Sequence, residues 1–202
     1  YLLENYGHRG PERRRRHFLR DVQGPGSNAE AEARTQFGVE DANAVLTAAG
    51  KPELAYYNAS ATDKYLVDQG GKWSAQAAND YMATILPEYS EANGNMVELI
   101  ICNNDGMAEG AVSALQGAGY NTGDGKTIPV FGVDATDSAK QLINEGKMTG
   151  TIKQDAEGMA STILNLVSSV QGGGELMDNT SSFNVDEGVA KIRVPYATYT
   201  GE

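Results

Sequence analysis

The chain has 202 residues and a formal net charge of −11 at pH 7. This length is enough to bury the core of one domain, or of one domain and part of a second. The acidic balance argues against nucleic acid or an anionic membrane as the main partner. The single cysteine, Cys102, lies in an apolar stretch, which excludes a disulfide framework and favours a buried thiol over a nucleophile.

The first 24 residues differ in composition from the rest of the chain. Six of the eight arginines lie between Arg9 and Arg20, within RGPERRRRHFLR. A basic run can indicate a nuclear signal or a nucleic-acid patch, but nothing after Asp21 extends it. Because the opening YLLENY has the pattern of the middle of a helix, we expect the chain to be a fragment of a longer protein.

From residue 28 onward, helical and strand patterns alternate. Helices are predicted over residues 28–49, 74–86, 106–117, 136–143 and 155–170. Strands are predicted over residues 53–59, 97–102, 128–133 and 149–153, and a loop with a short hairpin-like piece over 172–188 precedes a return at 191–196. The predicted inner face of the first helix is Ala31, Val39, Ala42, Val45, Leu46 and Ala49.

The pattern is clearest between Met96 and Ala135. Val97–Cys102 is a short apolar run, which is typical of a strand covered on both faces. Polar residues 103–105 follow it directly, and Asp134 follows the next strand. Parallel strands joined by a helix place their carboxyl ends at one edge of a sheet, where α/β folds bind ligands. We therefore predict an α/β fold with a ligand at this edge.

Residue chemistry alone leaves several roles open. Asn104 and Asp134 suit either hydroxyl recognition or capping of the following helix. Arg34 suits a solvated helix charge, and Trp73 at a helix entry suits a core residue. Asp105 and Asp134 would suit an acid–base enzyme, but both histidines lie in the arginine-rich passage and no nucleophile–base pair appears elsewhere.

Five stretches match one known family: NAEAEART, IICNNDGMAEGAVSAL, TIPVFGVDA, GTIKQDAEGMA and IRVPY. They resemble the periplasmic galactose/glucose-binding proteins, the sugar receptors of ABC importers, over about Gly26 to Glu202. The resemblance implies the type I periplasmic-binding-protein fold: an α/β protein with a three-layer α/β/α lobe, a mainly parallel sheet and a largely missing N-terminal lobe. It further implies that residues 1–153 form the C-terminal sugar-binding lobe, that 154–191 belong to the other lobe, and that 192–202 return to the first.

The resemblance also assigns sugar-binding roles residue by residue. Arg34 matches an arginine that hydrogen-bonds sugar hydroxyls and the ring oxygen, and WSAQA places Trp73 where the family stacks a tryptophan on the pyranose. A rigid aromatic plane can bury the apolar C–H face of a hexose. Three of the matched residues differ in type, because asparagine, glutamate and glutamine replace a histidine, an aspartate and an asparagine. The implied sugar-binding residues are Asn28, Glu30, Arg34, Trp73, Asn104, Asp134 and Gln154.

The family has an EF-hand-like calcium loop where this chain has its arginine run. Reading plausible codons for RRRRHFLRDVQG one nucleotide later gives the missing loop and strand, so we expect residues 9–24 to be a frame-shifted passage. Glu98 matches the glutamate that completes the calcium site from outside the loop, and calcium is expected only if that loop is present. If the passage is authentic, HFLRDV is expected to substitute poorly for the first strand.

The implied function is that of a non-enzymatic receptor for D-galactose or D-glucose outside the cytoplasm, in the periplasm or at the cell surface as a lipoprotein. Its implied partners are the hexose, the ABC transporter permease and, as a further candidate, a chemoreceptor. The alternative is the ligand-sensing domain of a sugar-responsive transcriptional repressor, which would need an N-terminal helix-turn-helix. By this comparison roughly 110 residues of the first lobe are absent. We therefore expect the chain to need that lobe or a second chain, and alone to bind sugar weakly or not at all.

Overall fold

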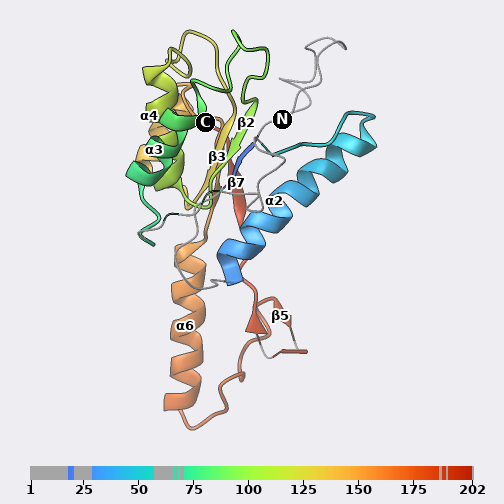
Figure 1. The fold of residues 1–202 in the computed structure, drawn as a ribbon. Helices are drawn as coiled ribbons and strands as arrows, with labels where there is room; N and C mark the ends of the chain where they lie inside the picture. The colour runs from blue at the N-terminus through green and yellow to red at the C-terminus, as the bar shows by residue number, and fades with distance from the viewer. Residues whose placement is uncertain are drawn as a thin grey trace. The chain divides into compact units, whose positions relative to one another are not determined.

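The computed structural model describes residues 18–20, 29–56, 66, 68, 71–186, 188–189 and 191–201 (Figure 1). A five-stranded sheet has the strand order β1-β2-β3-β4-β7, and β5 pairs antiparallel with β6. β1 pairs with β2, and β2 with β3, in parallel. The elements in chain order are β1 (Phe18–Arg20), α2 (Ala29–Ala48), α3 (Ala75–Ile85), β2 (Leu99–Ile101), α4 (Asp105–Gly117), β3 (Val130–Val133), α5 (Asp137–Asn144), β4 (Gly150–Lys153), α6 (Ala156–Gln171), β5 (Val185–Asp186), β6 (Lys191–Ile192) and β7 (Ala197–Tyr199).

Helices cover both faces of the sheet in the first of two compact units, residues 1–151 with 200–202. On one face, Val39 of α2 and Leu99 of β2 form a buried cluster, against which Leu54, Tyr56, Ile101 and Phe131 pack. On the other face lies α4, because a Cβ built on Gly132 of β3 would come within 3.2 Å of the Ala108 Cβ. α3 packs in turn on α4, and Figure 1 shows the two on the opposite side of the sheet from α2. The predicted three-layer α/β/α arrangement with a mainly parallel sheet is therefore confirmed.

Side-chain caps decide where four of the helices begin. In each case an oxygen accepts a hydrogen bond from the backbone N–H three residues ahead, which would otherwise have no intrahelical partner. These caps lie at positions that the sequence also marks as helix starts. The four bonds join Ser74 Oγ to Ala77 N at 3.2 Å, Asn104 Oδ1 to Met107 N at 2.9 Å, Thr136 Oγ1 to Ala139 N at 3.2 Å and Asp155 Oδ1 to Gly158 N at 2.9 Å.

Two local predictions are wrong. The first is the strand over residues 53–59: residues 53–56 are not in a strand, and residues 57–59 lie outside the described part. Leu54 N donates to Asn43 Oδ1 at 2.7 Å instead of joining a sheet. The inner face of α2 is narrower than predicted, because Val45 is 55% exposed while Ala31 and Val39 are buried. Figure 1 shows the second half of α2 extending away from the sheet, which explains this exposure.

β1, which lies within HFLRDV, is the first strand of the sheet and neighbours β2. Phe18 lies opposite Leu99 in register, and Arg20 lies opposite Ile101. Phe18–Arg20 therefore forms a short strand, which is the substitution expected if the arginine-rich passage is authentic. The rest of residues 9–24 lies outside the described part, so the frame-shift hypothesis stays a prediction.

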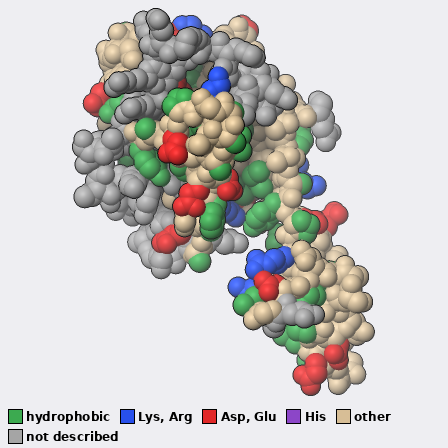
Figure 2. Space-filling view, turned by 90° about the vertical axis from the view of Figure 1, so that its right-hand side faces the viewer, with side chains coloured by type: hydrophobic (Ala, Val, Ile, Leu, Met, Phe, Trp, Pro, Cys, Tyr) green, Lys and Arg blue, Asp and Glu red, His purple; other side chains and the backbone are tan. Residues whose placement is uncertain are grey.

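The second unit, residues 152–199, contains α6 and the pair of strands β5 and β6. Four apolar side chains of α6 are between 46% and 67% exposed: Ile163, Leu164, Val167 and Val170. Figure 2 shows hydrophobic side chains, in green, at the surface of the molecule. Among the described residues, no helix has both the length and the apolar character to cross a membrane.

Candidate functional site

Polar side chains gather where β2 ends and α4 begins. Asn103 is 1% exposed, and its Nδ2 donates to Ala31 O at 3.0 Å and to Thr35 Oγ1 at 3.1 Å, both on α2. The next residue, Asn104, caps α4 and donates from Nδ2 to Trp73 O at 3.3 Å. Two adjacent asparagines thus join the carboxyl end of β2 to two segments that are distant in the sequence.

Arg34 lies at this same edge of the sheet. It is half-buried on α2, and its Nη1 donates to Asn103 O at 2.9 Å. The interpretation of Arg34 as a solvated helix charge is therefore wrong, because its guanidinium is anchored to the end of β2. A guanidinium carries five N–H donors in a fixed plane, which suits the recognition of hydroxyl and ring oxygens.

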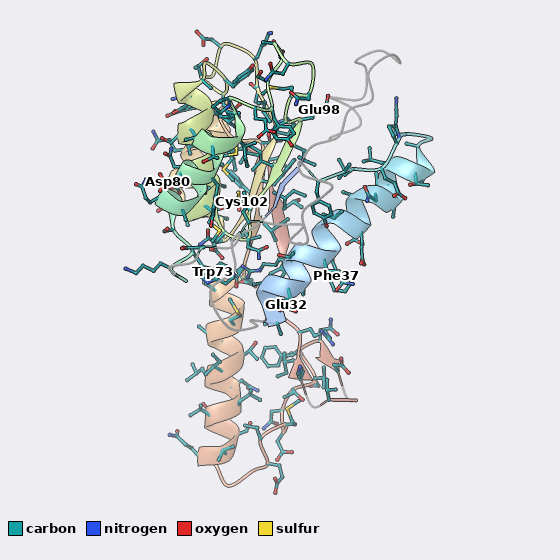
Figure 3. All side chains as sticks on the ribbon, in the orientation of Figure 1. Glu32, Phe37, Trp73, Asp80, Glu98 and Cys102 are labelled. Carbon is teal, nitrogen blue, oxygen red and sulfur yellow. The ribbon has the colours of Figure 1, made fainter. Side chains whose placement is uncertain are left out.

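Trp73 is placed by the turn that leads into α3. Its backbone has φ 53°, in the left-handed region that bulky side chains rarely adopt. A Cβ on Gly106, in the first turn of α4, would lie 3.6 Å from Trp73 O, so α4 begins close against this turn. Figure 3 shows Trp73 at the same end of the unit as Glu32 in the first turn of α2. Arg34, Trp73 and Asn104 therefore surround the carboxyl end of β2.

Asp134 follows the neighbouring strand, β3, and is exposed. Its φ is 122° and that of Ala135 is 55°, so two consecutive residues with side chains adopt positive φ. The next amides are held in place: Ala135 N donates to Thr151 Oγ1 at 3.3 Å, and Thr136 N donates to Asp105 Oδ2 at 2.8 Å. Because these bonds fix the turn, Asp134 is presented at the sheet edge on which Asn104 lies.

Asp105 is the buried support of this turn. Its side chain is fully buried, and its Oδ1 accepts from Thr151 Oγ1 at 2.6 Å. Burial raises the pKa of Asp105, the charge of Asp134 raises it further, and the bonds from Thr151 and Thr136 lower it. A buried carboxyl whose two oxygens both accept protein hydrogen bonds cannot reach a substrate. The pairing of Asp105 with Asp134 as an enzymatic acid and base is therefore wrong.

The contacts described do not test the roles of four other predicted residues. Asn28 and the side chain of Glu30 lie outside the described residues, and Gln154 belongs to the second unit. Glu98 is exposed and precedes β2, and Figure 3 shows it at the opposite end of the unit from Trp73. In the described ranges, no group of three or more His, Cys, Asp or Glu residues could hold a metal ion. The sugar roles of the first three and the calcium role of Glu98 stay predictions.

The residues that sequence reasoning missed are the supports of the site. Asn103 holds α2 against β2, Asp105 holds the turn after β3, and Asp68 accepts hydrogen bonds from the turn at Trp73. Asp68 and Asp105 are 4% and 0% exposed. For Asn103 and Asp105 the signal in the sequence was the run of polar residues directly after an apolar strand, which indicates a strand end but not its partners. Asp68 lies outside that run.

Sequence comparisons relate this chain to known proteins. Residues 22–175 match a family model described as a periplasmic binding protein domain. The D-galactose/methyl-galactoside binding periplasmic protein MglB of Haemophilus influenzae is 30% identical over 175 residues, which are 87% of this chain and 45% of that protein. The D-allose-binding periplasmic protein of Escherichia coli is 25% identical over 191 residues, 94% of this chain and 52% of that protein. The chain thus spans about half the length of these relatives.

The fold comparison points the same way. An ABC transporter solute binding protein from Burkholderia multivorans superposes with a TM-score of 0.60 at 23% identity, over 93% of this chain and 53% of that one. This likeness confirms the predicted type I periplasmic-binding-protein fold. The relatives are named as binding proteins, in agreement with the expectation that the chain is not an enzyme. On its residues 22–175, this chain belongs to the periplasmic binding protein family.

Proposed function

We propose that this chain carries one side of a monosaccharide site in the receptor of an ABC sugar importer, and that its sugar is D-galactose or D-glucose. The observation that supports the proposal best is the bond from Asn104 Nδ2 to Trp73 O at 3.3 Å, next to that from Arg34 Nη1 to Asn103 O at 2.9 Å. Together they bring the backbone of Trp73, the guanidinium of Arg34 and the amide of Asn104 to one strand end. The galactose-binding name of the Haemophilus influenzae relative supports the choice of sugar, while the Escherichia coli relative is named for allose.

The chemistry of these side chains suits a polyol. The Trp73 indole offers an apolar plane for one C–H face of a pyranose. Arg34 donates only, the Asp134 carboxylate accepts only, and the Asn104 amide does both. The two bonds of Asn104, to Met107 N and Trp73 O, use half of the capacity of a primary amide. A hexose hydroxyl, which both donates and accepts, can therefore be recognised from several directions.

In the proposed mechanism no covalent bond is made or broken. The sugar binds between two lobes and shifts the receptor from an open to a closed state, which the membrane permease recognises outside the cytoplasm. The identity of the hexose, the other partner proteins and a calcium site remain parts of the proposal. The repressor alternative has no support among the contacts described.

Isothermal calorimetry of the chain with D-galactose, D-glucose and D-allose tests this proposal. For the chain alone we expect weak saturable binding, in the millimolar range, with galactose or glucose preferred. Trp73→Ala is expected to lower the affinity about tenfold, since loss of stacking and of buried apolar area together cost on the order of 1–2 kcal/mol. Phe37→Ala, at an exposed aromatic residue of the same unit, is the matched control and should leave binding unchanged. No saturable binding of any of the three sugars would contradict the proposal.

A further inference from the structure

The turn before α3 holds a buried carboxylate that nothing in the sugar chemistry above uses. Asp68 is 4% exposed, although a charged side chain is costly to bury unless it is hydrogen-bonded. Its Oδ2 accepts three hydrogen bonds, from Lys72 N at 3.2 Å, Ser74 N at 3.1 Å and Ser74 Oγ at 3.3 Å. Its own backbone carbonyl accepts from Gly71 N at 2.8 Å. Through its carboxylate and its carbonyl, one aspartate thus binds residues 71, 72 and 74 ahead of α3.

The two amides that Asp68 binds lie on either side of Trp73. When the N–H groups of residues 72 and 74 converge on one oxygen, the backbone dihedrals of residue 73 between them are constrained. Trp73 accordingly has φ 53°, which a bulky residue adopts only where its surroundings impose it. Successive backbone amides that converge on an anion are a recognised way to bind negative charge, and here the anion belongs to the chain itself.

The same carboxylate is linked to the start of α3. Ser74 Oγ donates to Asp68 and also accepts from Ala77 N at 3.2 Å, so Asp68 orients the hydroxyl that caps the helix. The first turn of α3 contains no acidic residue of its own, and a negative charge at a helix N-terminus is stabilising. From the α4 side, Asn104 holds the Trp73 carbonyl at 3.3 Å. The turn is therefore fixed from both directions around Trp73.

We propose that Asp68 is a positioning residue, whose carboxylate holds Trp73 in its left-handed backbone conformation and thereby sets the direction of the indole plane. The effect of Asp68 on sugar affinity rests on the function proposed above, but the effect of Asp68 on the conformation of Trp73 does not. A residue that only stabilised the fold would lower the folded population without changing the environment of Trp73 in molecules that remain folded.

Tryptophan fluorescence tests the proposal directly, because Trp73 is the only tryptophan in the chain. The variants are Asp68→Ala, which removes the acceptor, and Asp68→Asn, which keeps one oxygen but not the charge. In the folded protein, as judged by circular dichroism, we expect acrylamide quenching to rise about twofold or more for Asp68→Ala. Asp68→Asn should show a smaller rise, and steady-state anisotropy should fall in the same order.

The matched control is Asn121→Ala. Asn121 also has positive φ and is fully buried, and its Nδ2 donates to Ile128 O at 2.8 Å and to Lys147 O at 3.0 Å. These contacts do not involve the segment around Trp73, so the variant should lose stability without changing the quenching of Trp73. If folded Asp68→Asn and Asp68→Ala both leave quenching at the level of the unmodified protein, the proposal is wrong.

A second measurement on the unmodified chain keeps the proposal testable if both variants fail to fold. The amides of Lys72 and Ser74 should exchange with deuterium at least tenfold more slowly than an unprotected loop amide, because both donate to a buried carboxylate. Exchange at the unprotected rate would overturn the proposal. A galactose titration distinguishes this proposal from the proposed function. If the Asp68 variants change the fluorescence of Trp73 but no sugar changes it, Asp68 positions Trp73 and the proposed sugar role of Trp73 is wrong.

Discussion

Gly110 on α4 is the position where a single methyl group should have the clearest consequence. α3 and α4 pack so closely there that a Cβ on Gly110 would lie 2.0 Å from Ala75 O, 2.7 Å from Ala75 C and 2.8 Å from Ala75 Cα. All three atoms belong to the backbone, so no side-chain rotation relieves the overlap. Gly110→Ala must therefore push apart the two helices or shift the start of α3.

The expected cost follows from two opposing effects. Overpacking of a well-packed contact costs about 1–3 kcal/mol, and the upper end applies here because the obstacle is backbone. Alanine in place of glycine inside a helix contributes about 0.5–1 kcal/mol of stability. The net expectation is a loss of roughly 2 kcal/mol. For a protein of this size, that corresponds to a decrease in Tm of about 4–8 °C.

Gly117→Ala provides the matched control in the same helix, since a Cβ there would have nothing within 4 Å. It should leave stability unchanged or raise it by up to about 1 kcal/mol. Thermal unfolding followed by far-ultraviolet circular dichroism measures both variants. Because Ala75 lies two residues after Trp73, Gly110→Ala should also change the Trp73 emission. If the two variants have equal Tm values, the close contact between α3 and α4 is wrong.

Two further predictions concern the supports of the site. Burial raises the pKa of Asp105 in the folded protein, so its stabilising contribution is full below the unfolded-state pKa and is lost as pH rises through the folded value. The amide of Asp105→Asn can still accept from Thr136 N. As the pH rises from the unfolded-state pKa through the folded-state pKa, this variant should therefore gain stability relative to the unmodified protein, as measured by urea titration. A stability difference that does not vary with pH would refute this. Arg34→Lys should lose the fixed bond to Asn103 O and weaken galactose binding by about tenfold, while Tm changes by less than about 2 °C. An unchanged affinity would show that Arg34 does not contact the sugar.

The fold was predictable where local signals and burial agree. The start of α4 is an example, because Asn104 follows an apolar strand and its amide makes the capping bond that the sequence indicates. The prediction failed where burial depends on what lies opposite. Val45 continues the apolar stripe of α2, yet it is exposed because that part of the helix has left the sheet. Residues 53–56 belong to a predicted strand but form none in the structure, and they pack as an irregular segment through Leu54.

In the candidate site, residue types were predictable and their supports were not. Arg34, Trp73 and Asn104 were found through motif resemblance, and the structure brings them to one strand end. The supporting bonds join residues that are far apart in the chain: 46 positions separate Asp105 from Thr151, and 72 separate Asn103 from Ala31. A single sequence carries no record of such pairs. Gly110 likewise looks like a weak helix residue until the backbone of α3 is placed against it.

The central claim is that Arg34, Trp73, Asn104 and Asp134 contact one monosaccharide. The most direct measurement is a nitrogen-15 NMR titration of the chain with D-galactose and D-glucose. It follows the Trp73 indole N–H, the Asn104 side-chain amide and the Arg34 Nε–H, with the buried Asn121 side-chain amide as the internal reference. We expect the three site signals to shift together along one saturation curve while the reference stays in place. Saturable shifts confined to other residues, or none at millimolar sugar, would contradict the account.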